Sequence, residues 1–192
     1  MKKFILGIFL SVCWCSSIIH AQDVALKTNL LYWLTTTPNL AMEFGVGEKS
    51  TVELSVGYNP WTLNKEENRK IKHIAVIPEY RYWLCEPFNG HFFGVHAGYT
   101  YYNLSAVRIL PFGDASTKDH RYQGWGIGAG LSYGYSWILN DRWSIEATVG
   151  FGYIYTNLDK YQCATCGYFR DDMDHHYVGP TNAGISLIYT IK

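Results

Sequence analysis

The most constraining feature of the sequence is a strict two-residue alternation across residues 123–137. One set of alternate positions is mostly large and apolar, whereas the other set contains only glycine and serine. A helix would scatter these glycines around its surface, but a strand places all of them on one face. The segment therefore predicts a β-strand with one bulky and one small face.

Similar alternation recurs along the chain and predicts an all-β protein. The expected strands are residues 24–34, 39–47, 50–60, 72–84, 90–103, 122–138, 142–157 and 176–191. Short connections at 48–50, 85–89 and 139–141 alternate with long polar ones at 61–71, 104–121 and 158–175, and only the first connection, near 35–38, is an exception. This layout is typical of an eight-stranded antiparallel transmembrane β-barrel of the outer membrane, with both termini at the periplasmic end.

The volume of the side chains indicates that the bulky face points outward. The chain contains 16 Tyr, 7 Trp and 9 Phe, and the interior of an eight-stranded barrel is only wide enough for side chains to fill. The opposite face is small or ionisable, and we expect a polar network in the lumen formed by Lys27, Glu43, Glu53, Glu79, Arg81, His96 and Glu146. Acids and bases can pair there, whereas an unpaired buried charge would be costly. A soluble lipocalin-like binder and a soluble β-sandwich are the alternatives.

The N-terminus has the features of an export signal. Lys2 and Lys3 precede an apolar stretch, and Ala21 supplies a small residue at the expected cleavage point. We expect residues 1–21 to be a cleaved signal peptide and residues 22–192 to form a single barrel domain. The net charge of zero and the absence of a basic stripe argue against nucleic acid as a partner.

Several segments resemble a Bacteroidales outer-membrane family catalogued as a domain of unknown function, number 3575. They are LKTNLLY (26–32), TTPN (36–39), GYNPWT (57–62), PEYRYW (78–83), NGHFFGVH (89–96), GAGLSYGY (128–135) and YVGPT (177–181). The resemblance covers nearly the whole exported part and implies an eight-stranded barrel without an assigned activity or cofactor. In architecture the chain is also similar to the small OmpA-type and OmpX-type barrels. It departs from the outer-membrane pattern in ending on Lys192 rather than on an aromatic residue.

Cysteine and acidic residues in the last long connection offer three chemical hypotheses. Cys163 and Cys166 form a CxxC, which in an exported protein favours a structural disulfide over a redox-active pair. Metal binding ranks below the disulfide but above the redox-active pair, and its candidate ligands are Asp171, Asp172, Asp174, His175 and His176. We expect no metal site, and we expect Cys85, in a short connection, to be unpaired.

The sequence points to a structural or surface-interaction role rather than to catalysis. The expected partners are outer-membrane lipid, the outer-membrane assembly machinery, and an extracellular or envelope protein that meets the long connections. A lipid A-modifying enzyme is the alternative, because histidines and serines such as His91, His96 and Ser132 are present. No local spacing, however, sets a nucleophile beside a base that a third group orients, so we expect neither an enzyme nor a cofactor.

Overall fold

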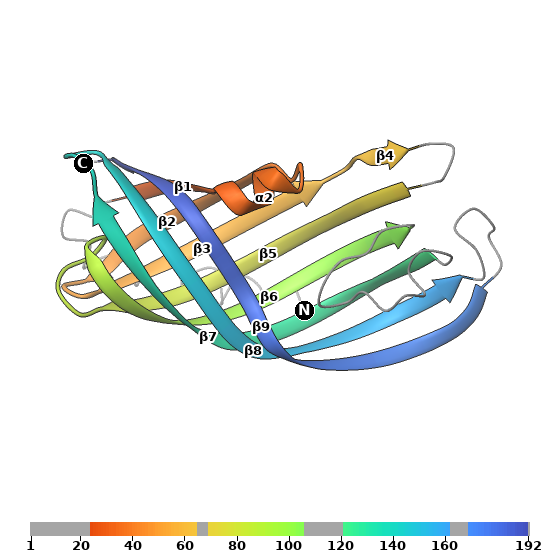
Figure 1. The fold of residues 1–192 in the computed structure, drawn as a ribbon. Coiled ribbons are helices and arrows are strands. Elements are labelled where there is room, and N and C mark those ends of the chain that lie inside the picture. The colour runs from red at the N-terminus through yellow and green to blue at the C-terminus, as the bar shows by residue number, and fades with distance from the viewer. Residues whose placement is uncertain (1–23, 65–68, 106–120, 162–168, 192) are drawn as a thin grey trace, which may run out of the picture.

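The computed structural model describes residues 24–64, 69–105, 121–161 and 169–191. In these residues the structure has nine strands and one short helix (Figure 1). They are β1 (Val24–Asn29), α2 (Leu30–Leu34), β2 (Asn39–Gly47), β3 (Ser50–Asn59), β4 (Thr62–Asn64), β5 (Arg69–Trp83), β6 (Gly90–Ser105), β7 (Arg121–Ile138), β8 (Trp143–Tyr161) and β9 (Phe169–Ile191). The expected signal peptide, the cysteine pair and Lys192 lie outside the described residues.

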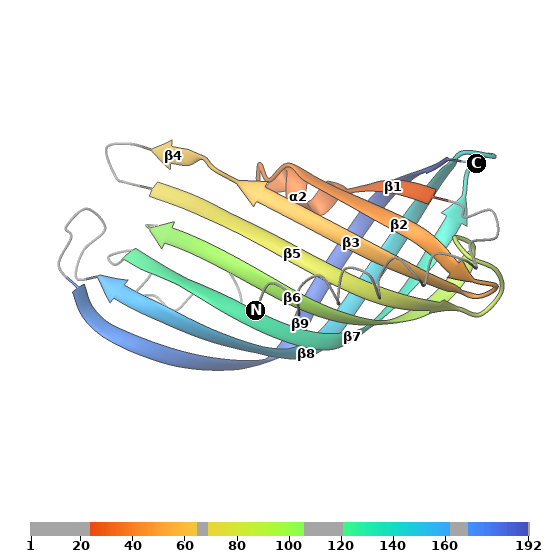
Figure 2. The same ribbon diagram turned by 180° about the vertical axis from the view of Figure 1, so that it is seen from behind.

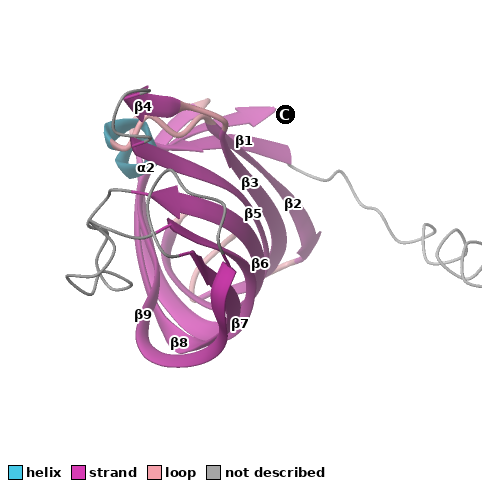
Figure 3. Ribbon diagram, turned by 90° about the vertical axis from the view of Figure 1, so that its right-hand side faces the viewer, coloured by secondary structure: helices cyan, strands magenta, loops and turns pink. Residues whose placement is uncertain are grey.

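Eight of the strands, all except β4, form a closed antiparallel ring. The sheet runs in the order β3-β2-β1-β9-β8-β7-β6-β5-β4, and β3 also pairs with β5, which closes the circle. β4 continues the line of β3 and pairs with the start of β5. The ring is visible from both sides in Figures 1 and 2, and Figure 3 shows it with the strands curving around a common interior. The expectation of an all-β chain with eight antiparallel strands is confirmed.

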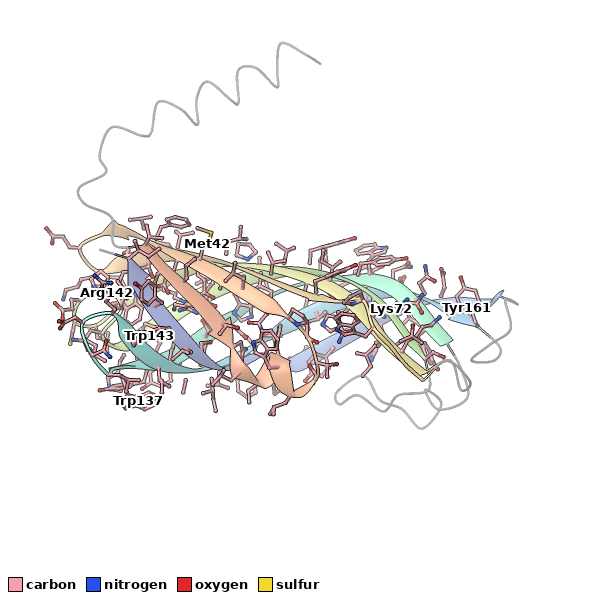
Figure 4. All side chains as sticks on the ribbon, turned by 90° about the horizontal axis from the view of Figure 1, so that it is seen from above. Met42, Lys72, Trp137, Arg142, Trp143 and Tyr161 are labelled. Atoms are coloured by element: carbon pink, nitrogen blue, oxygen red, sulfur yellow. The ribbon has the colours of Figure 1, made fainter. Side chains whose placement is uncertain are left out.

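The two faces of the ring carry different side chains. The outer face exposes large apolar residues, including Leu40, Met42, Leu54, Val56, Tyr80, Phe93, Val95, Ile127, Leu131, Phe151 and Val178. The buried side chains are mostly polar or charged, and the buried apolar residues are few. In Figure 4 the side chains of Met42 and Trp137 project away from the ring. The bulky faces of the strands therefore point outward, as the volume argument predicts.

The prediction that the first strand runs over residues 24–34 is wrong for residues 30–34. Instead of continuing β1, they form α2, which is capped by Asn29, whose side chain accepts a hydrogen bond from the Leu31 N–H at 3.0 Å. The sequence LLYWL is apolar at every position and so lacks the alternation that stabilises the neighbouring strands. Within the parts of the chain that the structure describes, no helix has the length and apolar character needed to cross a membrane.

The long connections are shorter than predicted because the strands continue into them. β8 extends to Tyr161 and β9 starts at Phe169, so much of the expected 158–175 connection is paired strand. β4 and the start of β5 likewise occupy parts of the 61–71 stretch. At that end, called here the long-connection end, β5 to β9 reach well beyond β1 and β2 (Figure 1). The opposite end, with the turns after β2, β5 and β7, is the short-connection end.

Candidate functional site

The interior of the ring contains a compact group of six ionisable side chains, called here the ionic cluster. It consists of Lys27 from β1, Glu43 from β2, Glu53 from β3, Glu79 and Arg81 from β5, and Glu146 from β8. All six residues are buried. The structure thus brings together six of the seven residues that were predicted to line the lumen.

Two cations hold the four carboxylates together. The Nη1 atom of Arg81 lies 2.9 Å from Glu53 Oε2, 3.0 Å from Glu146 Oε1 and 3.2 Å from Glu43 Oε2, and its Nε lies 3.0 Å from Glu79 Oε1. Lys27 Nζ lies 2.8 Å from Glu146 Oε2 and 3.1 Å from Glu53 Oε2, and it also pairs with Glu43. Every acid of the cluster therefore contacts at least one base.

The strand register explains why the two bases matter. Glu43 lies directly across from Glu53, and Glu53 lies directly across from Glu79 on the next strand of the ring. Like charges in direct cross-strand positions repel one another. Arg81 and Lys27 lie between these carboxylates and form ion pairs with them. The two bases thereby offset the repulsion between the acids of the cluster.

An aromatic floor closes the interior below the ionic cluster, toward the short-connection end. Trp83 and Phe92 lie with ring centroids 4.8 Å apart, and Phe88 packs against Trp83 at 6.1 Å. The Arg81 guanidinium lies 4.5 Å from the centre of the Phe92 ring, and the Trp83 indole donates a 2.9 Å hydrogen bond to Thr51 Oγ1. A cation over an aromatic face is attracted to it, most strongly where water is excluded.

Sequence reasoning missed this floor because it assigned the aromatic residues as a group to the outer face. A signal was available, since Trp83 has the same alternation parity as Glu79 and Arg81. Phe92 similarly shares its parity with His96. Parity within each strand would have placed both rings inside.

His96 stands apart from the ionic cluster. Its Nε2 atom lies 2.8 Å from Thr181 Oγ1, and among the described residues its buried Nδ1 has no hydrogen-bond partner. Thr181 occupies a β-bulge, because Phe151 pairs with Pro180 and Gly150 pairs with Asn182. The bulge directs Thr181 toward His96. A catalytic triad needs a group that orients the base through its second nitrogen, and no described residue does this at Nδ1 of His96.

A small polar cavity adjoins the ionic cluster on its long-connection side. Its volume is about 40 Å³, and its lining includes Lys27, Glu53, Arg81, Glu146, Tyr32 and Asn182. A buried water needs about 10–15 Å³ of such space. The cavity is therefore of a size for a few water molecules, and the side chains of the cluster and the floor fill the interior beneath it.

The remaining candidate residues do not converge on a chemical site. Tyr155 and Asn157 donate hydrogen bonds to Asp174 at 2.7 and 3.1 Å, and these bonds hold the pKa of the exposed Asp174 carboxyl, at the long-connection end, below its usual range. His176 Nδ1 lies 2.5 Å from the Tyr153 hydroxyl, and His175 is exposed. Among the described residues no group of three or more His, Cys, Asp or Glu side chains is placed to hold a metal ion.

The other residues considered for catalysis or redox chemistry are also separated from one another. The Ser132 hydroxyl donates a 2.7 Å hydrogen bond to Glu79, whereas His91 lies on the outer face, 2.7 Å from the Tyr133 hydroxyl. Cys85 is exposed and forms no disulfide with any residue in the described part of the chain. Cys163 and Cys166 lie outside the described residues, as do the side chains of Asp171 and Asp172.

The outer surface has a banded arrangement of side chains. Near the short-connection end, Trp143 packs on Tyr189 at 5.0 Å and Tyr135 on Trp137 at 4.7 Å. Toward the long-connection end, the rings of Trp125 and Tyr155 pack at 5.8 Å. The exposed residues between these two groups are predominantly aliphatic or Phe, including Val95, Ile127, Leu131, Val149 and Phe151. On β7 to β9 the outer face is therefore an apolar band with amphipathic aromatic residues on either side.

Comparison with known proteins gives one finding about the family. The model of the family described as "Protein of unknown function (DUF3575)" matches residues 7–191, which is nearly the whole chain. No curated protein and no solved structure matches the chain. The resemblance seen in the sequence segments is thereby confirmed at the level of the family.

Proposed function

The chain belongs to the DUF3575 family of proteins of unknown function, and from this premise we propose that it is a small outer-membrane β-barrel with a filled polar interior. Its architecture is of the general OmpA or OmpX type, and its source is a member of the Bacteroidales. It acts as a structural or surface-interaction protein through its long-connection end. Residues 1–21 direct its export, and the outer-membrane assembly machinery inserts it.

The single observation that carries this proposal is the inverted distribution of polarity. Leu131 is 67% exposed and Phe151 is 60% exposed, while Arg81 and Glu146 are almost completely buried. Soluble proteins rarely expose contiguous apolar patches of more than a few hundred Å². An apolar band between two aromatic girdles is the surface that a bilayer requires of a membrane barrel.

The filled interior supports a role without transport or catalysis. The ionic cluster and the aromatic floor occupy the space through which a solute would pass. Small barrels of eight strands have interiors that side chains fill. The parts that remain free to meet a partner are the ends of β5 to β9, which extend beyond the apolar band and carry polar residues such as Lys72 and Asp174.

Membrane extraction tests the proposal directly. We expect the protein to sediment with the outer-membrane fraction, to resist carbonate extraction and to dissolve only in detergent. The detergent-extracted protein should migrate differently on a gel before and after boiling, because a folded barrel resists unfolding in the loading buffer. Recovery of the protein from the soluble periplasm without detergent would overturn the membrane proposal and favour the lipocalin-like alternative.

Leu131→Arg should destabilise the protein in bilayers by about 2–4 kcal/mol, because it places a charge near the middle of the lipid-facing band. Urea unfolding of the refolded protein in vesicles, followed by tryptophan fluorescence, measures this change. Leu139→Arg is the matched control, since Leu139 is also exposed but lies in the short connection after β7. Equal stability of the Leu131→Arg protein and the unsubstituted protein would show that this face does not contact lipid.

A further inference from the structure

The wall of the ring has a seam where two strands stop early. β1 ends at Asn29 and β2 begins at Asn39, whereas the neighbouring β9 and β3 continue toward the long-connection end. α2 and residues 35–38 lie at this place, next to β3 and β9 (Figure 3). We call α2 together with residues 35–38 the seam segment. It replaces part of the strand ladder in the wall of the ring.

Side chains rather than a strand ladder satisfy much of the backbone at the seam. The Asn39 amide accepts a 2.6 Å hydrogen bond from the Asn29 N–H and donates a 2.9 Å bond to the Asn29 carbonyl. Asn29 Nδ2 donates to the Ala183 carbonyl of β9 at 3.2 Å. On the other side, Asn59 Nδ2 donates to the Thr35 carbonyl and to Thr37 Oγ1. In lipid, backbone polar groups must be satisfied within the protein, and these bonds contribute to that.

The seam segment is held in a specific and strained conformation. Thr36 has a φ of 56°, which is unfavourable for a β-branched residue. Its N–H donates to the Trp33 carbonyl at 3.0 Å, and its carbonyl accepts a 3.1 Å bond from the Trp61 indole. Such strain persists only where the surroundings impose it. The position of α2 is therefore imposed by its contacts rather than adopted by a free loop.

The outward side of α2 is apolar and has no charge. Leu34 is 81% exposed, and Leu30 and Trp33 are also exposed. α2 has no acidic residue in its first turn and no basic residue in its last turn. The Trp33 indole N–H donates to Thr28 Oγ1 at 2.8 Å, so this indole can lie in an apolar environment with its polar atom satisfied. Tyr32 lies on the other side, against Gly57 and in the lining of the polar cavity.

The height of α2 in the wall matches the edge of a bilayer. β2 has nine residues. At about 3.3 Å per residue and a tilt of about 40°, a strand of this length crosses about 23 Å. The apolar band of a membrane barrel is about 25 Å tall. Because α2 starts where β1 ends, it lies at the long-connection boundary of such a band.

We propose that α2 is a lipid anchor, with Leu30, Trp33 and Leu34 inserted at the bilayer boundary on the long-connection side. This inference rests on the proposed membrane location. It adds the position of the bilayer boundary on the long-connection side. Its occupant is lipid rather than a protein, because the exposed residues of α2 continue the apolar band through Leu40 and Tyr58 and offer a partner no charge to recognise. Aromatic residues at such boundaries place their apolar rings at the level of the headgroups.

Site-directed labelling tests the anchor without a large change to the fold. A full-length chain whose native cysteines are replaced by serine receives Leu34→Cys or, as a second variant, Leu30→Cys, and each is labelled with the environment-sensitive NBD fluorophore. Leu131→Cys reports the middle of the apolar band, and Asp141→Cys reports a short connection in water. The proteins are refolded into phosphatidylcholine vesicles, and a gel shift on boiling verifies folding.

The labels at positions 34 and 30 should show blue-shifted emission and should be quenched most strongly by lipids that carry a nitroxide near the headgroup. The label at position 131 should respond best to a deep nitroxide, and the label at position 141 to iodide in water. If positions 34 and 30 respond like position 141 while position 131 responds to lipid, α2 is not an anchor although the membrane proposal stands. If position 131 also responds only to iodide, both proposals fail.

Discussion

Arg81→Met should lower the free energy of unfolding by about 3–5 kcal/mol, the range for breaking a buried ion pair and leaving its partner uncompensated. Arg81 is 2% exposed and is the residue through which all four glutamates of the ionic cluster are joined. Without it, Lys27 remains as the only base of the cluster beside four carboxylates. Denaturant unfolding of the protein in detergent micelles or vesicles measures the loss.

Two further variants separate the charge of Arg81 from its shape. Arg142→Met removes an exposed arginine in the short connection after β7 and should change stability little, as exposed ion pairs and charges contribute little. Glu53→Gln, combined with Arg81→Met, should recover part of the loss because it removes one of the uncompensated carboxylates. A double-mutant cycle with no coupling between positions 53 and 81, or a cost for Arg81→Met similar to that of Arg142→Met, would show that the cluster is not held by charge.

Gly152→Ala should destabilise the ring by about 1–3 kcal/mol or more, the usual cost of adding a methyl group where no space exists. A Cβ atom at this position would lie 2.2 Å from the Ala129 carbonyl oxygen and 2.6 Å from the Gly130 Cα. Both are backbone atoms of the paired strand β7, so the two strands would have to move apart. The expected result is a lower unfolding midpoint in urea.

Gly98→Ala is the matched control for this prediction. Gly98 also faces the interior, but a Cβ atom there would meet Ile77 Cγ1 at an ordinary distance of 3.5 Å. Its stability should be unchanged or slightly increased, because alanine restricts the unfolded chain more than glycine does. If the two variants were equally stable, the close approach of β7 and β8 would not explain the glycines of this wall.

Most of the fold could be predicted from the two-residue alternation. Where the predicted strand bounds differ from the structure, the difference has a physical reason. The ranges predicted for β2, β3 and β7 agree with the structure to within one residue at each end. Residues 30–34 carry no alternation, so their sequence contains no signal for strand or for a change of face. At the end of β8 and the start of β9 the sequence is polar and the alternation is weak, so the sequence did not predict strand there. The two strands nevertheless pair with each other and are longer than predicted.

The sequence could predict which residues of the candidate site face the interior, but not how these residues contact one another. Parity placed Glu79 and Arg81 on the small face, and the same parity, applied consistently, would have included Trp83. It could not show that His96 pairs with Thr181 instead of with the ionic cluster, because that contact depends on a bulge in β9. The seam could not be predicted from the sequence either, since it forms from three separate segments that meet only in the closed ring.

The sequence by itself determined which side chains share a face, because consecutive residues of a strand must point to opposite sides. The tertiary structure alone decided which faces meet and in what register. Lys27 and Glu146 are 119 residues apart, yet their charged atoms lie 2.8 Å from each other. That contact exists because β1 and β8 both pair with β9, which places the first strand of the ring beside the last, and this arrangement depends on the whole set of strands rather than on any local pattern.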